Sequence, residues 1–358
     1  MKHFTLPAKY YVDPAYFSEE RERFFGKHWV CVGRSEDVEG VGAYVIRDVA
    51  GERVILTRSE DGEVRAFYNV CRHRGTRLCE KEAGKFNGRI QCPYHAWTYS
   101  LKGELVGAPG MNDVEGFNKA EYPLHSIACE VWEGHVFVNL SLAASPLSEQ
   151  LGSLVQKFAP WKMGELKRVK RAVYDIHANW KLIIQNYSEC LHCPVIHPAL
   201  EKVSHFMSGD NEPPTRHYLG GRMDLNPGVF TMSADGKQKR PYLPGVSEAD
   251  RRHVYYYALL PNLLLSLHPD YMMTHVLIPK ACDRTEIVCE FHFHPEAIAR
   301  SDFDPSDATD FWDMTNQQDW RISEESQRGI SSRGYTPGPY SPREGLLFGL
   351  DKIVRGEI

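Results

Sequence analysis

Residues 186–198 read Asn-Tyr-Ser-Glu-Cys-Leu-His-Cys-Pro-Val-Ile-His-Pro and hold two histidines, His192 and His197. Glu189 lies three residues before the first, so on a helix at about 100° per residue their side chains share a face. On the same helix the two histidines would point about 140° apart. Pro194 lies between them, and proline breaks or kinks a helix. We therefore predict a helix that carries Glu189 and His192, then a bend that returns His197 to the same point.

These residue types suit a mononuclear metal. Two neutral imidazoles on one metal leave room for a carboxylate from elsewhere in the chain, which is the facial arrangement of non-haem Fe(II) oxygenases. Alone, a His-x4-His spacing is a weak signal, because the chain holds sixteen histidines. The interpretation therefore depends on a second set of donors upstream.

That second set begins with Cys71-Arg-His73, which is followed after eighteen residues by Cys92-Pro-Tyr-His95. Two thiolates and two imidazoles in paired short loops suit tetrahedral zinc, or a [2Fe–2S] cluster with two Cys on one iron and two His on the other. A zinc knuckle is thus the alternative. Against it stand the Cys-x-His spacing of the first pair, the flanking Arg-Gly and Trp-Thr-Tyr residues, and strand-rich surroundings without a zinc-finger helix.

A family resemblance rests on these motifs. Cys-Arg-His-Arg-Gly and Cys-Pro-Tyr-His-Ala-Trp-Thr-Tyr resemble the cluster loops of Rieske non-haem iron oxygenases, and Asn-Tyr-x-Glu-Cys-x-His-Cys-Pro-x-x-His-Pro is similar to their mononuclear iron motif. Their order and separation match the oxygenase (α) subunit over essentially the whole chain. Two residues depart from the pattern. Ala96 replaces the usual glycine after the second cluster histidine, and Glu189 stands where many ring-dihydroxylating members carry aspartate.

The resemblance implies two metal cofactors, a [2Fe–2S] cluster and a mononuclear Fe²⁺. The implied cluster ligands are Cys71, His73, Cys92 and His95. The implied iron ligands on the second motif are His192 and His197, and Cys190 and Cys193 beside them are interpreted as neutral thiols.

The third iron ligand is expected on a late helix, which Asp304-Pro305 opens and which runs to about Gly329. Asn316, Asp319, Ser323 and Gln327 form a polar stripe on this helix, and a polar stripe on a buried helix usually faces something polar. The phrase Asn-Gln-Gln-Asp-Trp-x5-Ser-Gln-Arg-Gly also resembles the family's third-ligand helix. We predict Asp319 as the ligand, with Asp313 as the alternative.

Glu189 is predicted to act in catalysis without binding iron. It is placed to accept the free N–H of His192, and its second oxygen could serve His95 of a neighbouring subunit. A head-to-tail ring of three subunits, as in the family, would allow that bridge. The alternative is a purely local cap or ion pair. Asn186 is expected beside the iron ligands without binding the metal itself.

Composition limits the remaining possibilities. The chain has 358 residues and a net charge of −5, which gives no basic footprint for nucleic acid. The N-terminus lacks the apolar core of a signal peptide, and the longest apolar run is too short to span a bilayer. Nine cysteines, an odd number, favour a reduced cytoplasm over a disulfide framework.

The predicted fold class is α+β. Residues 1–37 are interpreted as an N-terminal helical segment that packs on the catalytic domain, and residues 38–140 as an all-β Rieske [2Fe–2S] domain. By resemblance, residues 141–358 form a helix-grip catalytic domain, an antiparallel sheet wrapped around a long helix. Residues 200–250 have little periodicity and are expected to form loops over the pocket.

The predicted function is that of a terminal oxygenase, which uses O₂ and electrons from NAD(P)H. The chain has no strand–GxGxxG–helix signature, so a separate reductase, with or without a ferredoxin, is the expected partner. The tail at 335–344 is more similar to the branch that hydroxylates or demethylates carnitine, choline and betaines. Aromatic residues that could form a cation–π cage are Trp180, Tyr255–Tyr257, Trp312 and Trp320.

Three alternatives remain: aromatic-ring hydroxylation, a Rieske electron carrier, and a zinc-stabilised binding module. An electron carrier would need only the module that ends near residue 140. The long second part of the chain, with its own metal triad, argues against it.

Overall fold

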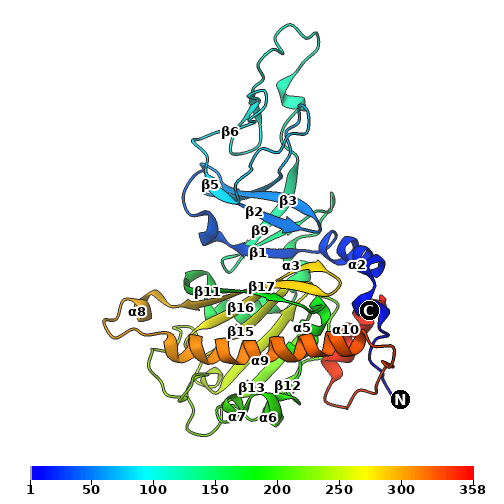
Figure 1. The fold of residues 1–358 in the computed structure, drawn as a ribbon. Helices are drawn as coiled ribbons and strands as arrows, with labels where there is room; N and C mark the ends of the chain where they lie inside the picture. Colours follow the sequence, from blue (N-terminus) through cyan, green and yellow to red (C-terminus); the bar gives the residue numbers. More distant parts are fainter. Residues whose placement is uncertain (1) are drawn as a thin grey trace. The chain divides into compact units, whose positions relative to one another are not determined.

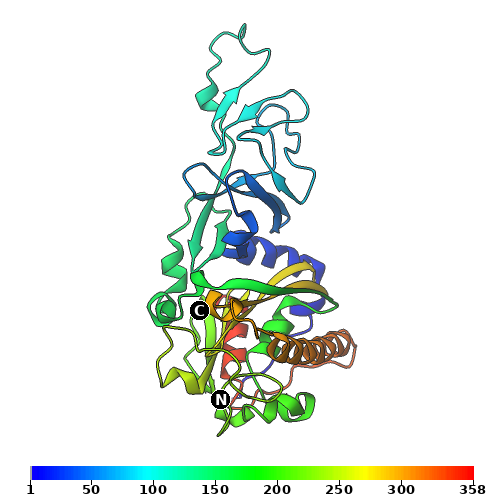
Figure 2. The same ribbon diagram turned by 90° about the vertical axis from the view of Figure 1, so that its left-hand side faces the viewer.

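The computed structural model describes residues 2–358, which divide into two compact units (Figures 1 and 2). One unit comprises the described residues up to Glu20 together with Ser148–Ile358, and the other comprises Arg21–Leu147. Each unit has its own antiparallel sheet alongside helices, so the fold is α+β, as predicted. Within residues 2–358 no helix combines the length and the apolar character needed to cross a membrane.

The smaller unit, Arg21–Leu147, is built on a seven-stranded sheet of order β1-β10-β9-β4-β3-β2-β5. Its strands are β1 (Val30–Arg34), β2 (Ala43–Val49), β3 (Glu52–Arg58), β4 (Val64–Tyr68), β5 (Ala83–Lys85), β9 (Ser126–Trp132) and β10 (His135–Asn139). Ala50 and Gly51 join β2 to β3 with φ of 51° and 88°. Positive φ at both positions is what a tight two-residue hairpin requires, so this turn was visible in the sequence.

A second sheet in the same unit supports the cysteine-containing loops. It has the order β6 (Ile90–Gln91), β7 (Thr98–Tyr99) and β8 (Leu105–Gly107). Residues 69–82 connect β4 to β5, and residues 92–97 connect β6 to β7. The buried side chains of Phe67, Ile90 and Trp97 belong to one apolar cluster with the three loop cysteines, Cys71, Cys79 and Cys92. Packing against this cluster fixes both loops on the unit.

The larger unit has a seven-stranded sheet of order β11-β17-β16-β15-β14-β13-β12. Its strands are β11 (Lys167–Ile176), β12 (Asp210–Asn211), β13 (Tyr218–Asp224), β14 (His253–Leu259), β15 (Leu263–Leu267), β16 (Met272–Ala281) and β17 (Arg284–Phe293). The long helix α9 (Ser306–Ile330) runs across one face of this sheet (Figure 1). Phe291 and Phe293 of the sheet pack with Phe311 and Trp312 of α9 in one buried cluster. This is the helix-grip arrangement expected from the sequence.

The shorter α-helices belong to the larger unit, α3 from its second residue onward. They are α1 (Lys9–Val12), α2 (Pro14–Glu20), α3 (Leu147–Leu151), α4 (Leu154–Phe158), α5 (Trp180–Tyr187), α6 (Cys193–Ile196), α7 (Pro198–Glu201), α8 (Pro295–Ile298) and α10 (Gly345–Arg355). Glu20, at the end of α2, accepts from Lys181 of α5 at 2.7 Å, and both side chains are at most 1% exposed. This buried ion pair ties α2 to the larger unit.

Two segments differ from the expected organisation. Residues 21–37 group with the smaller unit instead of the N-terminal helices, because β1 pairs with β10 from Val30 to Arg34. The interval 200–250 is not all loop, because it contains β13, which pairs with β14. This strand was not predicted because Gly220 and Gly221 suggested a turn. A Cβ on Gly220 would lie 2.5 Å from the Tyr256 carbonyl oxygen, so glycine is needed there for close packing between strands.

Candidate metal centres

The two cysteine-containing loops of the smaller unit have the same backbone closure. In each, the amide of the cysteine, Cys71 or Cys92, donates to the carbonyl five residues later at 2.8 Å. The amide four residues after the cysteine donates back to the cysteine carbonyl, at 3.0 Å in the first loop and 3.2 Å in the second. That fourth position is Gly75 in the first loop and Ala96 in the second, with φ of 73° and 55°. Ala96 therefore has the left-handed backbone that glycine adopts more easily.

This conformation leads to a stability prediction. Ala96→Gly is expected to raise the free energy of unfolding of the smaller unit by about 1 kcal/mol, because it relieves left-handed strain at a residue with a Cβ. The measurement is a denaturant titration followed by loss of cluster absorbance. Gly75→Ala is the matched reverse change, expected to lower stability by a similar amount, since its Cβ would meet nothing within 4 Å. Unchanged stability in both variants would contradict the strain.

The four candidate cluster ligands of these loops form two pairs, with the cysteines buried and the histidines nearer the surface. Cys71 and Cys92 are each 3% exposed, and burial, with the neighbouring Cys92 thiol, raises the pKa of Cys71. His73 and His95 lie towards the surface, with ring centroids 4.7 Å apart. A [2Fe–2S] cluster needs this separation, with two thiolates on one iron and two imidazoles on the other. The hydroxyl of Tyr99 lies 3.3 Å from the Cys71 sulfur, where a donor would stabilise a thiolate. The donor set fits the cluster.

In the larger unit, the histidine motif folds differently from the prediction. Helix α5 ends at Tyr187, so Glu189 and His192 do not lie on it. His192 instead precedes α6, and His197 lies between α6 and α7. Pro194 does not kink a helix but stands in the first turn of α6, where its missing N–H costs no hydrogen bond.

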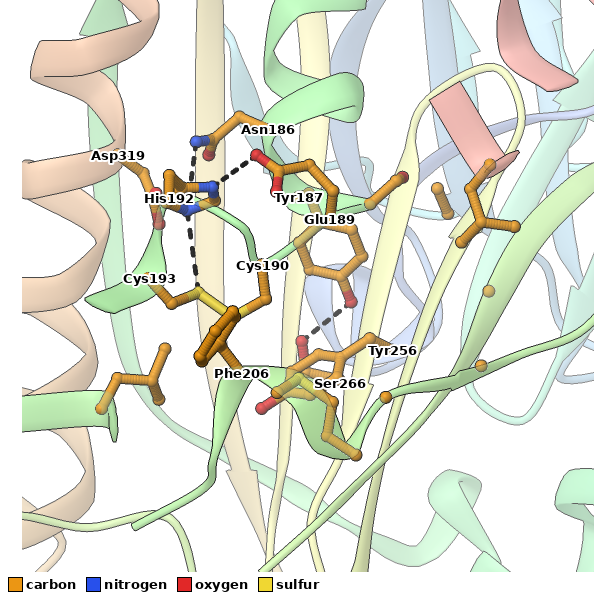
Figure 3. Close-up of a pocket in the computed structure, with 18 of the residues that line it drawn as sticks. Asn186, Tyr187, Glu189, Cys190, His192, Cys193, Phe206, Tyr256, Ser266 and Asp319 are labelled. Carbon is orange, nitrogen blue, oxygen red and sulfur yellow. Dashed lines mark hydrogen bonds and ion pairs between the residues drawn. A yellow bond between two sulfur atoms is a disulfide. The ribbon is translucent and has the colours of Figure 1, made fainter. Parts of the chain in front are cut away.

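His192, His197 and Asp319 come together in space. Figure 3 shows Asp319 beside His192. Their ligand atoms lie within 4.8 Å of one another, the only such group of three or more His, Cys, Asp or Glu in residues 2–358. Both imidazoles direct Nε2 at one oxygen of Asp319, at 3.3 Å from His192 and 2.8 Å from His197. Two nitrogens and a carboxylate oxygen on one face are the donor set of a non-haem Fe(II) site, so the residues fit a ferrous ion.

The other nitrogen of each imidazole is held by a side chain. Nδ1 of His192 donates to Oε1 of Glu189 at 2.6 Å, and Nδ1 of His197 donates to Oε1 of Gln318 at 2.7 Å. Asn186 Nδ2 lies 3.5 Å from His192 Nε2. Such partners fix the tautomer and orientation of metal ligands. Gln318 was missed in the sequence, although its position beside the predicted ligand on α9 was a usable signal.

The remaining oxygen of Glu189 has a local role. Oε2 accepts a hydrogen bond from the backbone N–H of Leu191. A carboxylate oxygen has a second lone pair, so a further partner is compatible with this cap.

Asp313, the alternative third ligand, lies elsewhere: Tyr174 donates to it at 2.5 Å and Gln317 at 2.8 Å.

Charge in the triad is balanced internally. Burial disfavours a charged His192 ring, but the Asp319 and Glu189 carboxylates outweigh it and raise the pKa of His192 to about 9. Burial alone would raise the pKa of Asp319, yet hydrogen bonds from His192 and His197 hold it below its ordinary value. The site therefore attracts a positive charge at this point, whether a proton or a metal ion.

The interpretation of Cys190 and Cys193 as free thiols is wrong for this structure. The two form a disulfide that spans His192, with their Cα atoms 5.0 Å apart (Figure 3). The turn into α6 brings the Cys-x2-Cys pair within the ordinary range for a bridge. The sulfur atoms are thereby occupied and are not metal ligands here.

A cavity of about 140 Å³ adjoins the triad. Its aromatic lining residues are Tyr187, Phe206, Tyr256, Trp312 and Trp320. Three of these were expected from the sequence, whereas Tyr187 and Phe206 were missed. Tyr255 and Tyr257 lie outside the cavity lining because side chains alternate along a strand, and both pack on Phe158 instead. Trp180 is also outside the lining: it is 1% exposed and donates to Glu20.

Comparison with known proteins agrees with both sites. Residues 28–118 match the Rieske [2Fe–2S] domain, and residues 163–356 match the catalytic domain of the ring hydroxylating α subunit. The glycine betaine monooxygenase oxygenase subunit of Pseudomonas aeruginosa is 31% identical over 94% of this chain and 85% of its own. The carnitine monooxygenase oxygenase subunit of Escherichia coli is 32% identical over 93% and 86%.

A solved structure extends the likeness to the fold. The quaternary ammonium Rieske monooxygenase CntA in complex with L-carnitine matches with a TM-score of 0.78 and 26% identity, over 99% of this chain and 95% of that one. The catalytic-domain match excludes a simple electron carrier and a zinc-stabilised module. The chain carries a Rieske [2Fe–2S] domain and a non-haem iron domain, and it belongs to the Rieske-type oxygenases as an oxygenase α subunit.

Proposed function

We propose that this oxygenase hydroxylates or oxidatively demethylates a small quaternary ammonium compound. The observation that carries the proposal is the aromatic cavity beside the triad. The chain is also about equally similar to a glycine betaine monooxygenase subunit and to a carnitine monooxygenase subunit. In this proposal Cys71 and Cys92, with His73 and His95, hold the cluster. His192, His197 and Asp319 hold the ferrous ion.

The cavity suits an organic cation. Tyr256 packs edge-on between Tyr187 and Trp312, with ring centroids 6.0 and 6.3 Å away. Aromatic faces attract quaternary ammonium groups, which cannot donate hydrogen bonds. Arg222 and Arg343 also line the cavity and would attract a carboxylate at the other end of a betaine. Arg222 donates to His253 at 2.9 Å, so its guanidinium is held in place.

Aromatic-ring hydroxylation, the alternative reaction, is supported by the fold alone. Naphthalene 1,2-dioxygenase of Rhodococcus sp. shares that fold with a TM-score of 0.74 but only 21% identity. An apolar ring offers no carboxylate to Arg343 of the lining, whereas Arg222 already lies 3.5 Å from Asp210. We therefore favour the quaternary ammonium substrate.

The protein residues have separate tasks in this reaction. Bound at the two sites, the cluster supplies electrons one at a time and the ferrous ion supplies oxygen activation. Glu189 and Gln318 orient the two imidazoles through their Nδ1 protons. The aromatic residues would exclude water and hold the substrate beside the triad.

The proposed partners follow from the reaction. The electrons come from NAD(P)H through a separate reductase, and Glu189 is proposed to link the cluster of one subunit to the iron of its neighbour in a homotrimer. A solved quaternary ammonium monooxygenase, 26% identical, is described by inter-subunit electron transfer. A cytoplasmic location stays a prediction, which rests on the odd number of cysteines. The Cys190–Cys193 disulfide argues against that location, because disulfides persist mainly in oxidising compartments.

The test is a substrate panel with a surrogate reductase, scored by O₂ uptake and product mass. We expect turnover with at least one of carnitine, γ-butyrobetaine, glycine betaine and choline, and none with naphthalene. A product of added oxygen or a lost methyl group separates hydroxylation from demethylation. Turnover of naphthalene alone would reject the proposed substrate class in favour of ring hydroxylation.

A further inference from the structure

A buried histidine in the cavity wall is not explained by metal binding. His275 of β16 is 2% exposed and lines the cavity, yet within residues 2–358 neither of its ring nitrogens has a partner that meets hydrogen-bond geometry. The side chain of Asn316 lies close enough to act on the ring as a weak hydrogen-bonding group and raise its pKa slightly. Its aromatic neighbours do not supply a partner. Tyr187, at a ring distance of 6.5 Å, directs its hydroxyl to Leu265 and Ser266. A buried polar group without a partner costs free energy, which a ligand in the cavity can recover.

The surroundings of His275 indicate what kind of ligand group, charged or neutral, could bind to its ring. Burial lowers the pKa of His275 to about 4, against smaller opposing effects of Asn316 and Asp319. The ring is therefore neutral, with one N–H donor and one acceptor nitrogen. A neutral imidazole brings no positive charge of its own to balance an anion. A hydroxyl, which both donates and accepts, complements a neutral imidazole.

The same surroundings place His275 close to the chemistry. Asn316 and Asp319 lie one turn apart on α9 and share a face. Asn316 is 3% exposed, lines the cavity and donates to the Cys289 sulfur at 3.7 Å. A substrate hydroxyl bound at His275 would thus lie on the metal side of the cavity.

We propose that His275 anchors a hydroxyl group of the substrate and so determines which quaternary ammonium compounds the enzyme prefers. The inference rests on the proposed function, because it requires a quaternary ammonium substrate in this cavity. It narrows that class to hydroxylated members.

Matched ligands test the proposal directly. L-Carnitine and γ-butyrobetaine differ by one hydroxyl, and so do choline and ethyltrimethylammonium. Their dissociation constants are measured by calorimetry on the anaerobic, iron-loaded protein without reductase, so that no turnover occurs. We expect the wild-type protein to bind the hydroxylated member of at least one pair about tenfold more tightly. His275→Phe is expected to bind both members of that pair equally.

Other variants separate hydrogen bonding from packing. His275→Leu repeats the comparison with a smaller side chain, and His275→Asn, which keeps a donor and an acceptor, should retain part of the preference. His268→Phe is the matched control. His268 is also fully buried, and its nitrogens have no hydrogen-bond partner in the described part of the chain. It stacks on Tyr271 at 4.1 Å and lies outside the cavity lining, so the preference should survive.

The outcomes distinguish this inference from the proposed function. No preference in the wild-type protein, or a preference that survives both His275→Phe and His275→Leu, overturns the role of His275 while the substrate class stands. A loss of affinity that is equal for both members of a pair assigns His275 to packing alone and also overturns it. Absence of binding by all four compounds overturns the inference, and the substrate class falls with it if glycine betaine is not bound either.

Discussion

Replacing Asp319 with alanine is expected to remove the mononuclear iron and abolish turnover while the cluster spectrum stays unchanged. Asp319 supplies the oxygen towards which both imidazoles point, at 3.3 and 2.8 Å. Without it, two neutral nitrogens remain, a weak site for a hard Fe²⁺ ion. Iron and sulfide analysis is the measurement. About three irons and two sulfides per chain in the wild type should become about two irons and two sulfides.

Asp313→Ala is the matched control for this change. Asp313 lies on the same helix, but its carboxylate is engaged by Tyr174 and Gln317 outside the triad. The variant should keep all three irons, whatever its effect on stability. Retention of the third iron in Asp319→Ala, with loss in Asp313→Ala, would move the ligand role to Asp313.

Glu189→Ala is expected to lower product formation by about 100-fold or more with both metal sites filled and the cluster still reducible. The variant removes the acceptor at 2.6 Å from His192 Nδ1 and the proposed contact to a neighbouring subunit. Stopped-flow absorbance should show fast cluster reduction but slow reoxidation in the presence of substrate and O₂. Glu189→Gln keeps an acceptor for His192 without the charge and separates orientation from charge. Near-normal single-turnover rates in Glu189→Ala would refute the bridge.

Mixed oligomers test the route of the electrons. Cys92→Ser should lose the cluster but keep its iron site and Glu189, whereas Glu189→Ala keeps the cluster and lacks the bridge. If electrons pass between subunits, co-assembled variants regain part of the activity that each lacks alone, because some neighbours combine an intact cluster with an intact iron site. Absence of any gain in verified mixed oligomers, or full activity in a verified monomer, would contradict the inter-subunit route.

The metal sites were more predictable from sequence than the path of the chain around them. Ligand chemistry restricts residue type and spacing, so Cys71 and Cys92 stood out, and the polar stripe on α9 singled out Asp319. Local helix geometry gave the right contact between Glu189 and His192 for the wrong reason, since α5 ends at Tyr187. A three-residue spacing brings side chains together in a tight turn as well as in a helix.

The parts that sequence reasoning missed depend on contacts between distant segments. Gly220 and Gly221 of β13 predict a loop from the local sequence alone. Only the pairing of β13 with β14 in the structure explains why glycines occupy these strand positions. Phe206 and His275 join the cavity only through the tertiary fold, and no local pattern marks either. The assignment of residues 21–37 likewise depends on β10, which follows β1 by about a hundred residues.

The unequal supports of the three iron ligands have a thermodynamic consequence. His192 and His197 flank α6 and α7, helices of four residues each, whereas Asp319 lies in the 25-residue α9. A four-residue helix has no stability of its own in water, so outside contacts must hold these turns in place. A bound ion would join them to α9, and its binding energy would add to the local folding energy of residues 188–204. We therefore expect bound iron to stabilise residues 188–204, and with them this wall of the cavity, relative to the metal-free protein.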